Sequence, residues 1–330
     1  MTLPQQKRIL SGVQPSGKLH VGNYFGAIKQ HIALQSEAKA FYFLADYHSM
    51  TTIQDAELRR TLTVEAALDY LALGLDPNQA AFFRQSDVPE VCELTWIFGT
   101  VINMGLLERA TSYKDKVAKG IEASVGLFTY PILMAADILI YRPDLVPVGE
   151  DQVQHVEMTR DIAERFNRTY KEVFPLPNYK LDAGAKVPGV DGQKMSKSYG
   201  NTIEIFAEGK PLKKSVMRIV TDSSGELDPK NPDTCTIFAL YKLFSTVDEQ
   251  AALAAQYRAG GMGYGVAKTK LLEKIDAYFA PFRDHRKKLA ADPAYVEDVL
   301  REGAKKARTE AVATMELVRA AVGFTVRPLG

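Results

Sequence analysis

Two lysines and two serines stand close together in the segment Asp191–Gly200, which reads DGQKMSKSYG. Lys194 and Lys197 are three residues apart, and a serine lies on either side of Lys197. Mobile ammonium groups beside hydroxyl groups suit a polyanion such as a triphosphate. Glycine at both 192 and 200 leaves the backbone free to bend. A solvated basic loop would have the same composition, so these two lysines alone do not decide the function.

A second stretch with phosphate-binding character, PSGKLHVGN, lies far upstream at residues 15–23. Its glycine and lysine spacing approaches a P-loop, but Leu19 stands where that motif needs a hydroxyl to hold magnesium. An alternative uses His20 and Gly22, since a glycine in the first helical turn lets a nucleotide approach backbone N–H groups. His20 could then donate to a phosphate oxygen in the transition state. A capping or packing role for His20 fits the pattern equally well.

Asp137 interrupts an otherwise apolar segment that we predict to be a helix over residues 126–141. A buried carboxylate is costly unless another group pairs with it. Tyr130 and Met134 share its helix face, because they precede it at helical spacing. An aromatic ring, a thioether and a carboxylate on one wall suit an aromatic ligand that carries N–H donors. The structural alternative is an ion pair with a residue such as Arg142, with Met134 as core filler.

Short apolar strands alternate with helices in the first half of the chain. We predict strands at residues 9–13, 40–45, 80–83 and 144–148, with helices from about 22, 55, 126 and 149. This order predicts an α/β fold with a Rossmann-like, doubly wound parallel sheet. Ligands bind such sheets at the carboxyl ends of the strands. The polar clusters Gln14–Ser16, Asp46–His48, Arg84–Ser86 and Gly149–Gln152 all fall there, although Asp151 could simply cap the following helix.

The alternation breaks at residues 90–126, which read as a helical insertion; in outline we place this insertion at about residues 50–126. Prolines and glycines between 175 and 192 indicate an irregular approach to the lysine segment. From about Ile205 the chain reads as helical throughout. We therefore predict a catalytic domain over residues 1–204 and an all-helical C-terminal domain over residues 205–330.

Composition restricts the class of protein further. Of the 330 residues, 46% are hydrophobic and 25% are charged, which is ordinary for a globular chain. The net charge of +1 offers no global attraction to nucleic acid, so any such binding needs local basic patches. Cys92 and Cys235 fit no metal or redox spacing, which favours a reducing, cytoplasmic location and no metal site. No apolar run is long enough for a membrane span, and no signal peptide is evident.

His20–Asn23 resembles the HIGH signature of class I aminoacyl-tRNA synthetases, and Lys194–Ser198 matches their KMSKS signature throughout. Four further runs resemble the bacterial tryptophanyl branch of that family: SGVQPSG at 11–17, TYPILMAADIL at 129–139, VPVGEDQ at 146–152 and VTDS at 220–223. The resemblance extends from about residue 9 to the C-terminus. Asn23 departs from the signature, which has a second histidine there, so His20 is less secure as a catalytic residue than the lysines.

The resemblance implies that the carboxylate of tryptophan attacks the α-phosphate of ATP, and that the tryptophanyl group then passes to tRNA(Trp). Asp137 would bind the indole N–H, and the other tryptophan-binding residues would be Tyr130, Met134, Gln152 and His48. The catalytic residues would be Lys194, Lys197 and His20, assisted by Lys116. Magnesium would arrive with the ATP phosphates. ATP would be bordered by Gln14, Pro15, Ser16, Gly22, Asn23, Gly149, Glu150, Asp151, Val187, Lys194, Met195, Ser196, Lys197 and Ser198.

The resemblance also implies a homodimer and an anticodon-binding role for the helical C-terminal domain. The phosphate-contacting patch would comprise Arg283, Arg286, Lys287, Lys288, Lys305, Lys306 and Arg308. An apolar stripe at Ala311, Met315, Val318 and Val322 indicates that one such helix also has a buried face.

Three rival readings stay open. A tyrosyl relative would share the fold and both signatures but carry a different pocket helix. A small-molecule adenylating enzyme fits less well with the long basic C-terminal region. A non-catalytic RNA-binding paralogue could be expected to lose Lys194 and Lys197, which are present.

Overall fold

The computed structural model describes residues 6–110, 124–181 and 187–325. The chain divides into two compact units, and each unit is assembled from separate stretches of sequence. The unit that we name the sheet unit comprises residues 1–17, 31–182 and 292–330. The second, which we name the loop unit, comprises residues 18–30 and 183–291.

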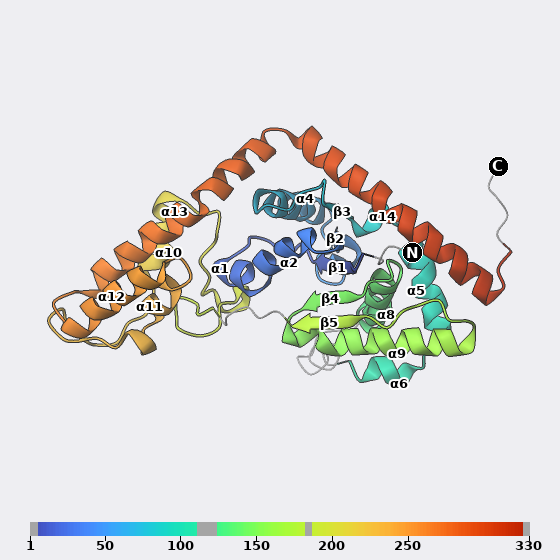
Figure 1. Ribbon diagram of the computed structural model, residues 1–330, viewed down its shortest axis with the longest axis horizontal. Helices are drawn as coiled ribbons and strands as arrows, with labels where there is room; N and C mark the ends of the chain where they lie inside the picture. Colours follow the sequence, from blue (N-terminus) through green and yellow to red (C-terminus); the bar gives the residue numbers. More distant parts are fainter. Residues whose placement is uncertain (1–5, 111–123, 182–186, 326–330) are drawn as a thin grey trace. The chain divides into compact units, whose positions relative to one another are not determined.

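A five-stranded parallel sheet in the order β3–β2–β1–β4–β5 forms the centre of the sheet unit (Figure 1). Its strands are β1 (Arg8–Val13), β2 (Lys39–Leu44), β3 (Ala80–Arg84), β4 (Leu145–Val148) and β5 (Asn178–Leu181). This order is that of a doubly wound sheet, so the predicted fold class and the four predicted strands are confirmed. Sequence reasoning missed β5, which is an edge strand with four exposed residues and no apolar alternation.

Helices pack around this sheet between its strands. They are α2 (Lys29–Ala33), α3 (Asp46–Ser49), α4 (Ala56–Ala72), α5 (Glu90–Val101), α6 (Met104–Glu108), α8 (Val125–Leu139) and α9 (Val153–Thr169). Short 3-10 turns occupy Leu34–Ser36, Gln85–Asp87 and Glu150–Gln152. One apolar core joins β1–β4 to α5, α8 and α9, and its largest fully buried side chains include Phe41, Phe83 and Tyr141.

The predicted insertion over residues 50–126 is drawn too wide, because β3 lies inside those limits. Among the described residues, the helices between β3 and α8 are α5 and α6. The narrower limits at residues 90–126, where the strand–helix rhythm breaks, agree better with these helices.

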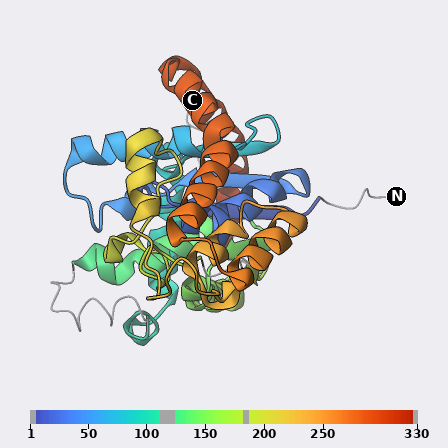
Figure 2. The same ribbon diagram turned by 90° about the vertical axis from the view of Figure 1, so that its left-hand side faces the viewer.

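The last helix, α14 (Pro293–Val322), belongs to the sheet unit and runs past β3 (Figure 1). Figure 2 shows the same orange-red helix from a second direction. A Cβ atom at Gly303 would lie 1.8 Å from the carbonyl oxygen of Phe82, so only glycine permits this approach. Ion pairs reinforce the contact: Arg308 with Glu90, and Glu310 with both Arg8 and Lys39. The helix thereby covers the edge strand, whose backbone groups would otherwise be open to other chains.

The compact units therefore do not divide at residue 204, where we expected a domain boundary. Residues 292–330 join the sheet through α14, while residues 18–30 join the loop unit. Helical content after Ile205 is nevertheless confirmed by α10 (Gly209–Met217), α11 (Thr236–Tyr241), α12 (Val247–Ala259), α13 (Tyr264–Ala290) and α14, with a 3-10 turn at Pro232–Thr234.

An aromatic cluster holds the loop unit together. The helix α1 (Val21–Asn23) continues into a π-helical turn at Tyr24–Ile28. Tyr24 and Phe25 from this turn pack in edge-to-face contacts against Phe244 and Tyr278, and the hydroxyl groups of Tyr24 and Tyr278 lie 3.1 Å apart. These contacts bind the N-terminal stretch of the loop unit firmly to α13.

Candidate active site

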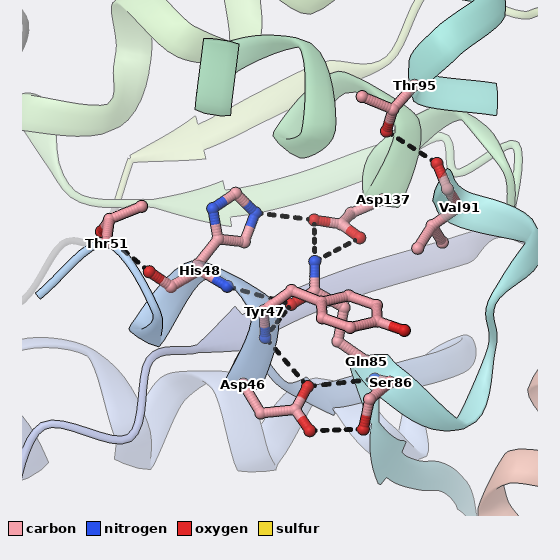
Figure 3. A network of polar contacts seen from close by, with 9 residues as sticks. All are labelled: Asp46, Tyr47, His48, Thr51, Gln85, Ser86, Val91, Thr95 and Asp137. Atoms are coloured by element: carbon pink, nitrogen blue, oxygen red, sulfur yellow. Dashed lines mark hydrogen bonds and ion pairs between the residues drawn. The ribbon is translucent and has the colours of Figure 1, made fainter. Parts of the chain in front are cut away.

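Asp137, on α8 of the sheet unit, is only 2% exposed and is satisfied by two side chains. Its Oδ2 lies 2.8 Å from Nε2 of His48, and both carboxylate oxygens accept hydrogen bonds of 2.8 Å from Nε2 of Gln85 (Figure 3). The alternative of an ion pair with Arg142 is therefore wrong. Burial raises the pKa of the Asp137 carboxyl, and hydrogen bonds from His48 and Gln85 act in the opposite direction.

Gln85 links Asp137 to the start of α3. Its Oε1 accepts hydrogen bonds from the backbone N–H groups of Tyr47 and His48, at 3.1 and 3.4 Å. Because this oxygen faces two donors, its amide nitrogen must face the carboxylate, and the amide orientation is determined. The side chain is 1% exposed. Sequence reasoning placed residues 84–86 at a strand end but did not single out Gln85.

A cavity of about 350 Å³ lies beside this network in the sheet unit. Its wall includes Tyr130 and His48, as expected, but neither Met134 nor Gln152. The Tyr130 hydroxyl lies 2.5 Å from Nε2 of His155, whose pKa burial lowers. The remaining lining residues are Tyr47, Met50, Thr51, Cys92, Thr95, Ser124, Gly126, Thr129 and Leu133. A hollow of this size and mixed lining suits a small aromatic molecule.

The other strand-end residues of the sheet unit form their own local contacts. Gln14 donates to the hydroxyl of Thr52 at 3.4 Å, while Pro15 is buried and Ser16 exposed. Gly149 accommodates the Asp151 carboxylate, since a Cβ there would lie 2.9 Å from Oδ1. Asp151 does not cap α9 and instead accepts a hydrogen bond of 2.7 Å from Gln152.

In the loop unit, His20 is the N-cap of α1. Its Nδ1 accepts from the backbone N–H of Asn23 at 3.3 Å, and the Asn23 side chain accepts from the His20 backbone N–H at 3.2 Å. This reciprocal cap gives Asn23 a structural role. Burial, and then the positive charge of Lys197, lower the pKa of His20 from its ordinary 6.5 to about 4. The neutral ring uses Nδ1 as an acceptor, so its proton is on Nε2.

The segment after the lysines pairs with the segment around His20. Val21 donates its backbone N–H to the Ile203 carbonyl at 2.9 Å, and Ile205 donates to the Leu19 carbonyl at 3.1 Å. The Lys18 ammonium pairs with Glu204 at 3.0 Å. These contacts bring the two signature motifs together within one unit.

A thioether forms a direct contact between the two motifs. Met195, only 4% exposed, accepts a hydrogen bond at Sδ from the Gly22 backbone N–H, at 3.3 Å. A Cβ on Gly22 would lie 3.0 Å from the His20 ring and 3.2 Å from Cβ of Met195. A side chain at residue 22 would therefore crowd both the His20 ring and Met195.

Asn201 closes the base of the segment Asp191–Gly200, which we name the lysine loop. Sequence reasoning missed this residue. Its Nδ2 donates to Asp191 at 2.8 Å and to the Lys194 carbonyl at 3.1 Å, while its Oδ1 accepts from the Ser196 N–H at 2.8 Å. The side chain is 2% exposed. Gly189 makes room for it, because a Cβ there would lie 2.4 Å from the amide.

The loop held by Asn201 exposes its cationic side chains. Lys194, Lys197 and Ser198 are exposed, whereas Met195 and Val187 are buried beneath them, with Met195 donating its N–H to the Val187 carbonyl at 2.9 Å. The bends expected at glycine are present, since φ is 81° at Gly192 and 62° at Gly200.

Lys116 lies outside the described residues. Arg283, which we placed in a basic patch, is wrong as a surface residue, because it is 5% exposed and pairs with Asp276. Burial of its guanidinium was not evident from the sequence, since Arg283 begins the charged run RDHRKK near the end of its helix.

Comparisons with known proteins match these features. Residues 4–280 match the family described as tRNA synthetases class I (W and Y). The chain is 54% identical to the tryptophan–tRNA ligase of Rhodopirellula baltica over 96% of this chain and 99% of that one. It is 55% identical to that of Fusobacterium nucleatum, over 96% and 98%. A crystal structure of Campylobacter jejuni tryptophanyl-tRNA synthetase, complexed with ADP and tryptophan, superposes with a TM-score of 0.93 at 49% identity, covering 96% and 100% of the chains.

Proposed function

Because the chain belongs to the class I tRNA synthetase family of the tryptophan and tyrosine enzymes, we propose that it activates L-tryptophan with ATP and charges tRNA(Trp). A tryptophan carboxylate oxygen attacks the α-phosphorus, the bond to the β-phosphate oxygen breaks, and pyrophosphate leaves. A hydroxyl at the 3′ end of tRNA then attacks the acyl carbon, and AMP is released. The activity is that of an aminoacyl-tRNA synthetase.

The observation that carries this assignment is the buried carboxylate of Asp137 beside a small cavity. An ionised carboxylate accepts hydrogen bonds and cannot donate one, so it selects a ligand that offers an N–H group. Three hydrogen bonds already reach this carboxylate, which has about four acceptor positions. We assign the remaining acceptor position to the indole N–H. Asp137 does not itself line the cavity, but its partner His48 does, together with Tyr130.

The phosphate chemistry belongs to the exposed lysines and the capped histidine. We assign Lys194 and Lys197 to neutralising the charge that develops on pyrophosphate as it leaves. His20 is neutral at physiological pH and offers only its Nε2 proton, so it acts as a hydrogen-bond donor to phosphate and not as a general acid. No nucleophilic side chain is needed, because substrate positioning and charge stabilisation carry the reaction.

Exchange of pyrophosphate into ATP tests the proposal directly. With tryptophan the exchange should proceed, and with tyrosine it should not. Asp137→Ala should weaken tryptophan activation, while Lys194→Ala or Lys197→Ala should slow single-turnover adenylate formation more than tryptophan binding. Exchange that depends on tyrosine would favour the tyrosyl relative, and no exchange with any amino acid would favour a non-catalytic paralogue.

ATP requires a divalent cation, and we propose that Mg²⁺ is held by the phosphates themselves. Among the described residues, no group of three histidine, cysteine or acidic side chains is arranged to hold a metal. The described residues therefore do not fit a protein cage for the ion, and the phosphate oxygens of ATP would supply its ligands.

We propose that the helices after residue 205 contact the anticodon arm of tRNA. On α13, Lys288 is exposed and the Arg286 guanidinium lies over the Phe206 ring at 5.1 Å. On α14, Lys305 and Lys306 are exposed, the first paired with Glu302 and the second bonded to the Pro77 carbonyl. Surface ion pairs of this kind contribute little stability, so these cations can exchange them for contacts with tRNA phosphates.

A homodimer is the second part of the proposed assembly. Trp96, Met104 and Val125 are 75%, 61% and 79% exposed, and they line a shared hollow of about 960 Å³ in the sheet unit. Large apolar side chains clustered on a surface are typical of a protein interface. Trp96→Lys should therefore convert a dimer to a monomer in light scattering, whereas the same change at exposed Leu227 should not.

We propose a cytoplasmic location, which accords with the charging of tRNA. The free thiols of Cys92 and Cys235 are typical of a reducing compartment. Among the described helices, none has the length and apolar character that crossing a membrane requires.

A further inference from the structure

Gln85 has no assigned role, yet every polar atom of its buried side chain is directed at the tryptophan-recognition residues. Its nitrogen contacts both oxygens of Asp137, and its oxygen contacts the two N–H groups that begin α3 (Figure 3). The same α3 carries His48, the second partner of the carboxylate. One amide thus sets the position of both the carboxylate and the histidine.

We infer that Gln85 is the positioning residue for tryptophan specificity: it holds the Asp137 carboxylate ionised and oriented toward the indole N–H. This inference rests on the proposed function. The physical reason is that a carboxylate without a donor partner in a buried site takes up a proton instead. A protonated Asp137 would present a hydroxyl donor, which conflicts with an N–H donor on the ligand.

The charged and titratable groups around Asp137 are few. His48 faces it from α3, and Asp46 acts on it from the start of the same helix. Cys92 on α5 and Tyr141, which follows α8, experience its charge. Asp46 is itself bonded to the Ser86 backbone N–H at 3.0 Å. Within the described residues, the hydrogen-bond donors to the Asp137 carboxylate are His48 and the uncharged amide of Gln85.

Gln85→Glu separates the two functions of the amide. The introduced carboxyl retains the oxygen that anchors Tyr47 and His48, but replaces the donor that faces Asp137 with an acceptor. Two carboxyl groups this close share one proton, so the pair titrates together. When the pair holds that proton, the introduced carboxyl can donate to Asp137 as the amide did. When it has lost the proton, the two charges repel.

The test compares tryptophan with 3-benzothienyl-L-alanine, in which sulfur replaces the indole N–H at nearly the same shape. In the parent protein, kcat/KM for pyrophosphate exchange should favour tryptophan strongly and should fall at low pH only for tryptophan. In Gln85→Glu the preference should fall by about 100-fold at alkaline pH and recover as the pH is lowered. Gln85→Met should lose the preference at all pH values.

Gln79→Glu is the matched control. It makes the same change at an exposed residue just before β3, whereas Gln85 is the buried residue just after β3. Circular dichroism verifies folding of each variant. A folded Gln85→Glu that keeps the parental preference and pH profile refutes the inference. Equal loss of activity with both amino acids also refutes it, as this indicates a merely structural role. The parental pH profile is a separate check: a low-pH loss of equal size for both amino acids contradicts the inference. A parent protein inactive with tryptophan refutes the proposed function itself.

Discussion

Replacing Asn201 with alanine should slow adenylate formation without weakening tryptophan binding. The Asn201 side chain makes three hydrogen bonds, to Asp191, to the Lys194 carbonyl and to the Ser196 N–H, at 2.8, 3.1 and 2.8 Å. Each such bond contributes about 1 kcal/mol net. Their loss should therefore destabilise the ordered lysine loop by about 3 kcal/mol in total.

A penalty of this size corresponds to about 100-fold in rate, if the loop must be ordered for pyrophosphate to leave. Because the aromatic cavity belongs to the sheet unit, KM for tryptophan should stay unchanged. Single-turnover formation of tryptophanyl-AMP in a quenched-flow instrument measures the rate, and titration with tryptophan measures binding.

Asn231→Ala is the matched control, since Asn231 is an exposed cap of a short 3-10 turn in the same unit. This variant should keep the parental rate. A single-turnover rate for Asn201→Ala within about threefold of the parent would refute the reasoning, because threefold is well under 1 kcal/mol. An equal rise in KM for tryptophan would show that the asparagine does not act through the lysine loop alone.

Two further predictions concern stability. Gly303→Ala should lower the melting temperature, because its Cβ would meet the Phe82 backbone at 1.8 Å and overpacking costs about 3 kcal/mol; Gly99→Ala, a helical site with nothing within 4 Å, should instead stabilise by about 0.5–1 kcal/mol. His20 binds a proton more weakly when folded, so stability should be full above pH 6.5 and fall by roughly 3 kcal/mol as the pH drops toward about 4. Urea unfolding at several pH values measures this loss, which should be absent in His20→Asn, where a non-titrating residue keeps the cap; identical pH dependence in both proteins would contradict it.

The spacing of apolar residues, and the glycines, prolines and polar clusters between apolar runs, predicted most of the fold. Four strands were found because they are buried, apolar runs that end in polar clusters, as at Asp46–His48. The exposed β5 carries no such pattern, since an edge strand is defined by its backbone partner and not by its side chains. The unit boundary was missed for a related reason: nothing local shows that Gly303 meets Phe82.

The candidate site was predictable where residue types carry the chemistry. Asp137, His48 and Tyr130 meet as expected in the sheet unit, and Gly22 of the HIGH-like segment meets Met195 of the KMSKS segment in the loop unit. Gln85 and Asn201 were missed because a buried amide looks like any surface amide in sequence. Their importance follows from satisfying several partners at once, which only the folded chain shows.

The packing of α14 on β3 has a consequence for how the protein is made. Phe82 and Gly303 are about 220 residues apart in the chain, so the ribosome must add all the residues between them before this contact can form. Until α14 emerges, β3 is an open strand that can pair with a neighbouring nascent chain. The sheet can thus assemble early, yet its protection against aggregation arrives only after α14 has been synthesised.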